Sequence, residues 1–154
     1  MRQGLCKDLG FSKEDRVTNI ERTIFVASLL AQNGTATLVS FVSPYRKMRD
    51  DARNKVEGYV EVFVRCPLPI CEKRDVKGMY AKAWRGEIKD FTGISAPYEE
   101  PQNPDLVIDT SLHNIAESVD LLAHYVDRQF VEPVRNLEVE SITGKPRDWL
   151  ATGI

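Results

Sequence analysis

The sequence predicts an α/β domain built around a parallel β-sheet. Three observations lead to this fold class: helix-like and strand-like segments alternate, the first strand-like segment is a β-rich run without clean polar alternation, and 154 residues suffice for one domain. Apolar runs without polar alternation are typical of strands that are covered on both faces, as in a parallel sheet. The alternation itself favours parallel strands that are connected by helices.

The first half of the chain predicts a helix, a strand and a second helix. Ser12 is a suitable N-cap with Asp15 three residues later, apolar residues then recur at helical spacing, and Gly34 stands where a C-cap glycine is expected. The run TATLVSFV at 35–42 predicts a buried strand. The strongly charged segment 46–56 predicts an exposed helix.

The second half continues the alternation. The predicted elements are a strand at 59–66, a helix that begins at the prolines of 67–75, a strand at 105–110 and an amphipathic helix at 114–130. Between them, the segment 76–91 is basic and carries three aromatic side chains, and the proline-rich segment 95–104 must be a loop. Residues 1–130 are therefore predicted as one domain and residues 131–154 as a C-terminal tail without an assigned role.

Composition excludes several classes of function. Lys and Arg number 21 against 23 Asp and Glu, a net charge of −2, which argues against a general nucleic-acid or membrane binder. No apolar run approaches the roughly 18 residues of a membrane span, and the N-terminus lacks a signal-peptide core. Three cysteines without CxxC spacing and two histidines predict neither a disulfide framework nor a metal site. A reducing, cytoplasmic location is expected.

Candidate binding residues follow from the predicted sheet. Ligands of open parallel sheets bind beyond the carboxyl ends of the strands, where SPYR (43–46) lies. Guanidinium groups bind anions through paired hydrogen bonds, and aromatic faces stack on a base. Taken singly, each of these residues is more typical of a solvated surface or a core than of a site. Together they suit a ligand with an anionic group and a flat ring: Arg2, Phe11, Arg16, Asn19, Lys77 and Phe91.

The order of several motifs adds a family resemblance. FVSPYRKMRDDAR, RDVKGMYAKA and FTGIS occur in sequence behind the opening stretch RQGLCKDLGFSKEDRVTNIER. These strings closely resemble the adenylylsulfate kinase family, and the resemblance runs from Arg2 to about Tyr125. A chance match of all of them, in order and at family spacing, is very improbable.

The resemblance implies both an activity and a fold. The family consists of P-loop kinases, which transfer the γ-phosphoryl group of MgATP to the 3′-hydroxyl of adenylylsulfate. The product is 3′-phosphoadenylylsulfate, the activated sulfate donor of sulfate assimilation. The expected partners are therefore adenylylsulfate and ATP with Mg²⁺, and the expected fold is a three-layer α/β domain with a parallel sheet.

The resemblance also implies which residues bind the substrate. Arg2, Arg16 and Asn19 would hold the phosphosulfate group. Phe11 and Phe91 would enclose the adenine ring between them. These assignments agree with the ligand type, anionic and flat, that the residues themselves suggest.

Two residues are implied as catalytic, Ser43 and Lys77. Val42 and Ser43 would line the substrate pocket at the end of a strand. Ser43 also matches a serine that is described in the family as a phosphoserine intermediate, although phosphoryl transfer by positioning and Mg²⁺ needs no covalent step. Lys77 would belong to a mobile lid that covers the nucleotides, where its charge would stabilise the transferring phosphoryl group.

One family motif is missing from the chain, the GxxxxGK[ST] loop that binds ATP phosphates and Mg²⁺. The family's strand order, 2-3-1-4-5, makes the missing first strand central, and the second strand is missing too. We therefore expect an N-terminally truncated domain, and doubtful kinase activity of the isolated chain. The empty place would remain open, be closed by direct pairing of 35–42 with 59–66, or be filled by the tail or another chain.

An alternative function also fits these observations. The chain would then be a non-catalytic module that binds a sulfonucleotide or pairs with an intact kinase subunit. Family members are commonly dimers, so a homodimer is a further possible partner arrangement.

Overall fold

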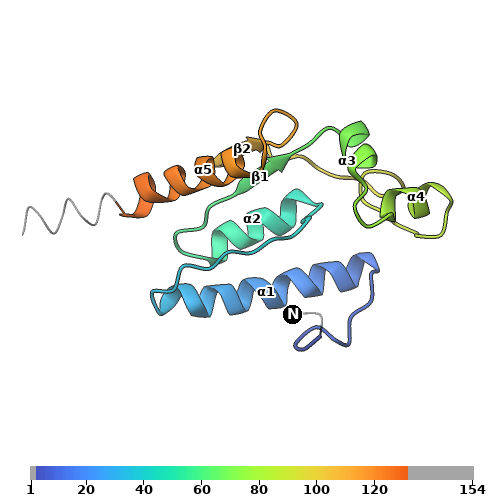
Figure 1. Cartoon of the computed structure of the whole chain (residues 1–154). Helices are drawn as coiled ribbons and strands as arrows, with labels where there is room; N and C mark the ends of the chain where they lie inside the picture. Colours follow the sequence, from blue (N-terminus) through green and yellow to red (C-terminus); the bar gives the residue numbers. More distant parts are fainter. Residues whose placement is uncertain (1–2, 132–154) are drawn as a thin grey trace, which may run out of the picture. The chain divides into compact units, whose positions relative to one another are not determined.

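The computed structural model describes residues 3–131, and the chain divides into two compact units after Ser111. The first unit contains a parallel sheet with four helices, and the second consists of helix alone (Figure 1). The predicted α/β class with a parallel sheet is thereby confirmed. Most of the predicted tail, residues 132–154, lies outside the described residues.

The first helix, α1, spans Lys13–Gln32 and has the predicted caps. The Ser12 hydroxyl accepts a hydrogen bond from the Asp15 N–H at 3.1 Å. At the other end Gly34 has φ +73°, and the Thr35 N–H donates to the Leu30 carbonyl at 3.0 Å. These bonds form a Schellman-type end, for which a glycine at positive φ is the favoured residue.

Helix α2, Arg46–Lys55, packs against α1 (Figure 1). Ile20 of α1 and Met48 and Ala52 of α2 are buried and supply much of the apolar core of this unit. The helix was predicted as exposed, and on one face this is wrong, because Arg49 is buried there too. Apart from Arg49 and the half-buried Asp51, the charged residues of the helix are exposed as predicted.

The sheet consists of β1, Val62–Arg65, and β2, Leu106–Asp109, in parallel register with Val64 opposite Ile108. Both strands fall within the predicted runs and are shorter than them. The connection between them contains α3, Leu68–Arg74, and α4, Met79–Trp84. Helix α3 begins at prolines as predicted, and residues 98–104 form a loop.

The predicted strand at 35–42 is not observed. No strand of the described chain lies beside this segment, so its backbone has no ladder to join. Its apolar side chains remain accessible, and Leu38 is 85% exposed. Direct pairing of this segment with β1, one of the expected outcomes, does not occur. A strong strand pattern cannot form a strand without a neighbour.

The second unit contains α5, Ile115–Val126, which continues into a π-helical turn, Asp127–Val131. Helix α5 begins with a capping box: the Asn114 side chain accepts from the Glu117 N–H at 3.0 Å, and the Glu117 carboxylate accepts from the Asn114 N–H at 2.8 Å. The predicted helix at 114–130 is confirmed. None of the helices that the structure describes has the length and apolarity to cross a membrane.

Candidate functional site

A small hollow forms where the N-terminal half of α1 faces the segment that precedes α2. Its volume is about 140 Å³. Four residues that were predicted to bind the substrate meet here although they come from two separate segments. The lining consists of Arg16, Asn19, Ile20, Phe41, Val42, Ser43 and Pro44.

Asn19 gives this hollow its polar character. Asn19 is only 4% exposed, and its Oδ1 atom has no hydrogen-bond partner among the residues that the structure describes. A buried carbonyl oxygen without a partner costs about 1–3 kcal/mol, so native proteins rarely keep one without a reason. An acceptor in this position suits a hydroxyl or amino group of a ligand.

Arg16, half-buried at the first turn of α1, connects the hollow to a distant loop. Its Nε donates to the Phe11 carbonyl at 3.0 Å, and its two terminal nitrogens donate to the Asp90 carbonyl at 2.7 Å and to the Thr92 hydroxyl at 3.2 Å. These acceptors are neutral, and among the described residues Arg16 forms no ion pair with a carboxylate. Its positive charge therefore remains without a counter-ion at the edge of the hollow.

Arg16 contacts the chain at both phenylalanines that were predicted to enclose an adenine: it binds the Phe11 carbonyl itself and the two residues on either side of Phe91. Phe11 is 77% exposed. Phe91 is half-buried, and its ring meets the Tyr80 ring edge-on with centroids 5.1 Å apart. Burial, and then the neighbouring Cys71, raise the pKa of Tyr80 to about 12, so its hydroxyl stays protonated near neutral pH. Arg16 thus ties the backbones next to both rings to α1.

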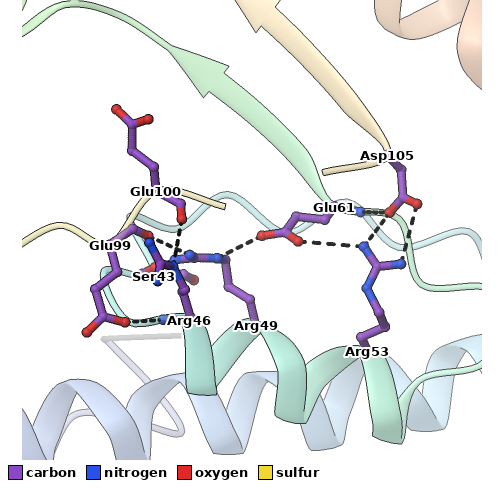
Figure 2. Close-up of polar contacts among 8 residues, drawn as sticks. All are labelled: Ser43, Arg46, Arg49, Arg53, Glu61, Glu99, Glu100 and Asp105. Atoms are coloured by element: carbon purple, nitrogen blue, oxygen red, sulfur yellow. Dashed lines mark hydrogen bonds and ion pairs between the residues drawn. The ribbon is translucent and has the colours of Figure 1, made fainter. Parts of the chain in front are cut away.

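Ser43 sits in an unusual backbone conformation, with φ +41°. A non-glycine residue in this left-handed region costs about 1–2 kcal/mol, so the surrounding structure must hold it there. The Ser43 carbonyl accepts a hydrogen bond from the buried Arg49, whose guanidinium also donates to the Glu99 carbonyl (Figure 2). The Glu99 N–H in turn donates to the Pro44 carbonyl at 2.8 Å.

Acidic residues at the start of the two strands complete this network. Glu61 forms an ion pair with Arg49 at 2.7 Å and a longer one with Arg53 at 3.6 Å (Figure 2). Arg53 also pairs with Asp105 at 2.7 Å, and the Asp105 carboxylate accepts the Glu61 N–H at 2.7 Å. The hydrogen bond from Arg53 lowers the pKa of Asp105.

Sequence reasoning did not find this arginine network. Arg46 belongs to it as well, since its Nε donates to the Glu100 carbonyl at 3.0 Å and its N–H to the Glu99 carboxylate at 2.8 Å. Arg46, Arg49 and Arg53 are spaced i, i+3 and i+7, which places them on one face of a helix. That spacing was the signal that could have indicated a shared set of internal partners.

The remaining predicted residues lie elsewhere. Arg2 is outside the described residues, and Lys77 is exposed in the turn between α3 and α4 and does not line the hollow. This turn is held by Asp75, whose carboxylate accepts the N–H groups of Tyr80 and Ala81, each at 3.0 Å. Desolvation opposes ionisation of Asp75, but these backbone hydrogen bonds outweigh it and lower its pKa.

Metal ligands are not gathered at the hollow. Within residues 3–131, no three His, Cys, Asp or Glu side chains come close enough together to hold an ion.

Comparison with known proteins places this geometry in a family. The sequence profile of the adenylylsulphate kinase family matches residues 1–109. The adenylyl-sulfate kinase of Halothermothrix orenii is 54% identical over 129 residues, which cover 84% of this chain and 70% of the relative. That of Rippkaea orientalis is 57% identical over 119 residues, covering 77% and 66%. The chain thus spans about two thirds of the length of these relatives.

Solved structures agree with the sequence matches. The APS kinase of Mycobacterium tuberculosis, determined in complex with AMPPNP and APS, superimposes with a TM-score of 0.71 at 45% identity, covering 79% of this chain and 75% of that one. A hexameric APS kinase from Thiobacillus denitrificans gives 0.60 at 29% identity, covering 83% and 21%. The fold is therefore shared with known kinases. The chain belongs to the adenylylsulfate kinase family.

Proposed function

We propose that this chain functions in the ATP-dependent phosphorylation of adenylylsulfate at its 3′-hydroxyl, and that the hollow between α1 and residues 41–44 is part of the adenylylsulfate site. The observation that carries the proposal is the unpartnered, buried Oδ1 of Asn19 beside the uncompensated charge of Arg16. High identity to adenylyl-sulfate kinases over most of the chain supports an enzyme of this kind over a non-catalytic module.

The roles of the site residues follow from their surroundings. Arg16 would exchange one of its neutral protein acceptors for an oxygen of the phosphosulfate, with Arg2 as a second cation. Asn19 would accept a hydrogen bond from the ligand, because its oxygen has no other partner. Phe11 and Phe91 would enclose the adenine, since Arg16 holds the backbone beside each of them.

Ser43 and Lys77 are proposed as the residues nearest the chemistry. Val42 and Ser43 would form the wall against which the nucleoside lies. Lys77 would reach the transferring phosphoryl group when its turn closes over the site, because its side chain is exposed. Ser43 would contact the substrate, and direct in-line transfer makes a phosphoserine unnecessary.

The wider proposals concern fold, location and assembly. We propose that β1 and β2 belong to a three-layer α/β fold of the P-loop kinase type. Free thiols at Cys6, Cys66 and Cys71 support a reducing, cytoplasmic location. A homo-oligomer is supported by the hexameric relative. ATP with Mg²⁺ is the proposed phosphoryl donor.

Calorimetric titration of the 154-residue chain tests the central proposal. Adenylylsulfate is the probe, and adenosine 5′-monophosphate, which lacks the sulfate, is the matched control. We expect adenylylsulfate to bind at micromolar concentration and the monophosphate to bind at least tenfold more weakly, because the monophosphate lacks the sulfate oxygens that would accept hydrogen bonds from the arginines. Absence of adenylylsulfate binding at high micromolar concentration would refute the proposal. Formation of 3′-phosphoadenylylsulfate from ATP is measured in parallel, and in the isolated chain we expect little.

A further inference from the structure

We propose that Arg49 is a positioning residue of the adenylylsulfate site: it fixes the backbone at Ser43 and so sets the wall of the hollow without touching the ligand. This inference rests on the proposed function and adds to it a residue outside the pocket. Arg49 does not line the hollow. Its guanidinium instead joins three segments that are far apart in the sequence.

The contacts of Arg49 use its whole guanidinium. One terminal nitrogen donates to the Ser43 carbonyl, the other donates to the Glu99 carbonyl, and Nε forms the ion pair with Glu61 (Figure 2). The side chain is 8% exposed, so little water can replace these partners. The planar fork of arginine offers donors in several fixed directions at once, which the single ammonium group of lysine cannot match.

The Ser43 carbonyl is the contact that matters for binding. Its backbone, at φ +41°, belongs to a region that a serine rarely adopts, so this conformation needs an external restraint. Arg49 supplies one restraint through its hydrogen bond to the Ser43 carbonyl, and the hydrogen bond from the Glu99 N–H to the Pro44 carbonyl supplies another. Release of Ser43 toward ordinary backbone angles would turn residues 41–44, the wall of the hollow.

The same network explains why arginine is tolerated inside the protein. Glu61 is only 13% exposed and neutralises Arg49, while Arg53 and Asp105 keep Glu61 in place. Removing Arg49 alone would leave the Glu61 carboxylate buried beside one distant cation, a strongly destabilising change. Removing both charges together avoids this penalty, because buried ion pairs are often replaced by apolar residues without loss of stability.

The test compares two variants and a matched control in the full chain. Arg49→Lys keeps the charge opposite Glu61, and the double variant Arg49→Met/Glu61→Met removes the pair. Lys47→Gln on the same helix is the control, because this lysine is 86% exposed and pairs only with Asp51 at 3.4 Å. Adenylylsulfate affinity is measured by calorimetry, thermal unfolding by circular dichroism, and exchange of the Glu99 amide hydrogen by mass spectrometry or NMR.

We expect both Arg49 variants to bind adenylylsulfate about tenfold more weakly or worse, from the loss of a hydrogen bond to a charged donor. The Glu99 amide should exchange at least tenfold faster, although the double variant unfolds near the wild-type temperature. Lys47→Gln should bind within twofold of wild type. A merely structural role for Arg49 would lower the unfolding temperature and leave the affinity of the folded protein unchanged.

Two outcomes would overturn the inference, and they differ from failure of the proposed function. If the wild type binds and both folded Arg49 variants bind within twofold of it, Arg49 does not position the site. If the wild type does not bind, the proposed function fails. The exchange rate of the Glu99 amide hydrogen then tests the positioning role by itself, and an unchanged rate in the Arg49 variants would refute that role as well. If the double variant does not fold, the affinity and the Glu99 amide exchange of Arg49→Lys provide the test instead.

Discussion

Replacement of Asn19 by leucine should stabilise the protein and weaken its binding at the same time. The Oδ1 atom of Asn19 is buried without a partner, and leucine of similar size removes the cost of that orphan acceptor, about 1–3 kcal/mol. Leucine is also the better helix former by about 0.5 kcal/mol. We expect Asn19→Leu to raise the free energy of unfolding by about 1.5 kcal/mol, allowing for imperfect packing in the hollow.

The matched control is Asn54→Leu in α2. Asn54 is exposed and helical, so the same substitution there gains at most the helix propensity and removes no buried acceptor. Urea unfolding of wild type and both variants, followed by circular dichroism, gives the difference between the two substitutions. That difference, about 1 kcal/mol in favour of Asn19→Leu, isolates the cost of the orphan oxygen.

Binding should move in the opposite direction. Asn19→Leu removes the acceptor that we assign to the ligand, so adenylylsulfate affinity should fall by about tenfold or more. Unchanged affinity would refute the assignment of Asn19 to the site. If Asn19→Leu were less stable than Asn54→Leu, the oxygen would be satisfied in the folded protein and the reasoning from its burial would be wrong.

Two further predictions concern the rings and the carboxylates. Phe11→Ala should weaken adenylylsulfate binding by about tenfold and leave the free energy of unfolding almost unchanged, because Phe11 is 77% exposed. Phe91→Ala should lower both the affinity and the free energy of unfolding, because the Phe91 ring packs against Tyr80. Calorimetry measures the affinity, and urea unfolding measures the stability. Because Arg53 lowers the folded-state pKa of Asp105, its carboxylate stabilises the protein above the unfolded pKa of about 4, and this contribution is lost as the pH falls below it. Asp105→Asn should flatten the loss of unfolding free energy between pH 5 and pH 3, and an unchanged slope would contradict this.

The ends of α1 could be predicted from the sequence because their signals are local. Ser12 and Gly34 act within a turn of the residues that they cap, so both ends could be placed before any tertiary contact was known. Helix α4, which lies in the segment 76–91, was not predicted. The outcome at 35–42, where a strand was predicted and none is observed, could not be foreseen in the same way. Its composition favours a strand, but a strand also needs a hydrogen-bonded neighbour, and sequence pattern alone does not supply one.

The site could be predicted in part, and the limit has a physical cause. The hollow brings together Arg16, Asn19, Val42 and Ser43, four residues that the sequence singled out. Their assignment to adenylylsulfate remains a prediction, as do the roles of Arg2 and Lys77. The charge of a residue is visible in the sequence, whereas its partners are not, so the internal network around Arg49 could not be distinguished from a binding surface.

Whether an arginine is already paired with a carboxylate decides whether it can bind an anionic ligand. Arg49 and Arg53 already face the carboxylates of Glu61 and Asp105, and an added anion would have to compete with these carboxylates. Arg16 faces two carbonyls and a hydroxyl, which accept its hydrogen bonds but leave its charge uncompensated. A sulfonucleotide at the hollow would replace a neutral acceptor of Arg16 with an anionic one, a gain that the paired arginines do not offer. We therefore expect Arg16 of α1 to bind an anionic ligand, whereas Arg49 and Arg53 of α2 stabilise the fold through the protein's own carboxylates.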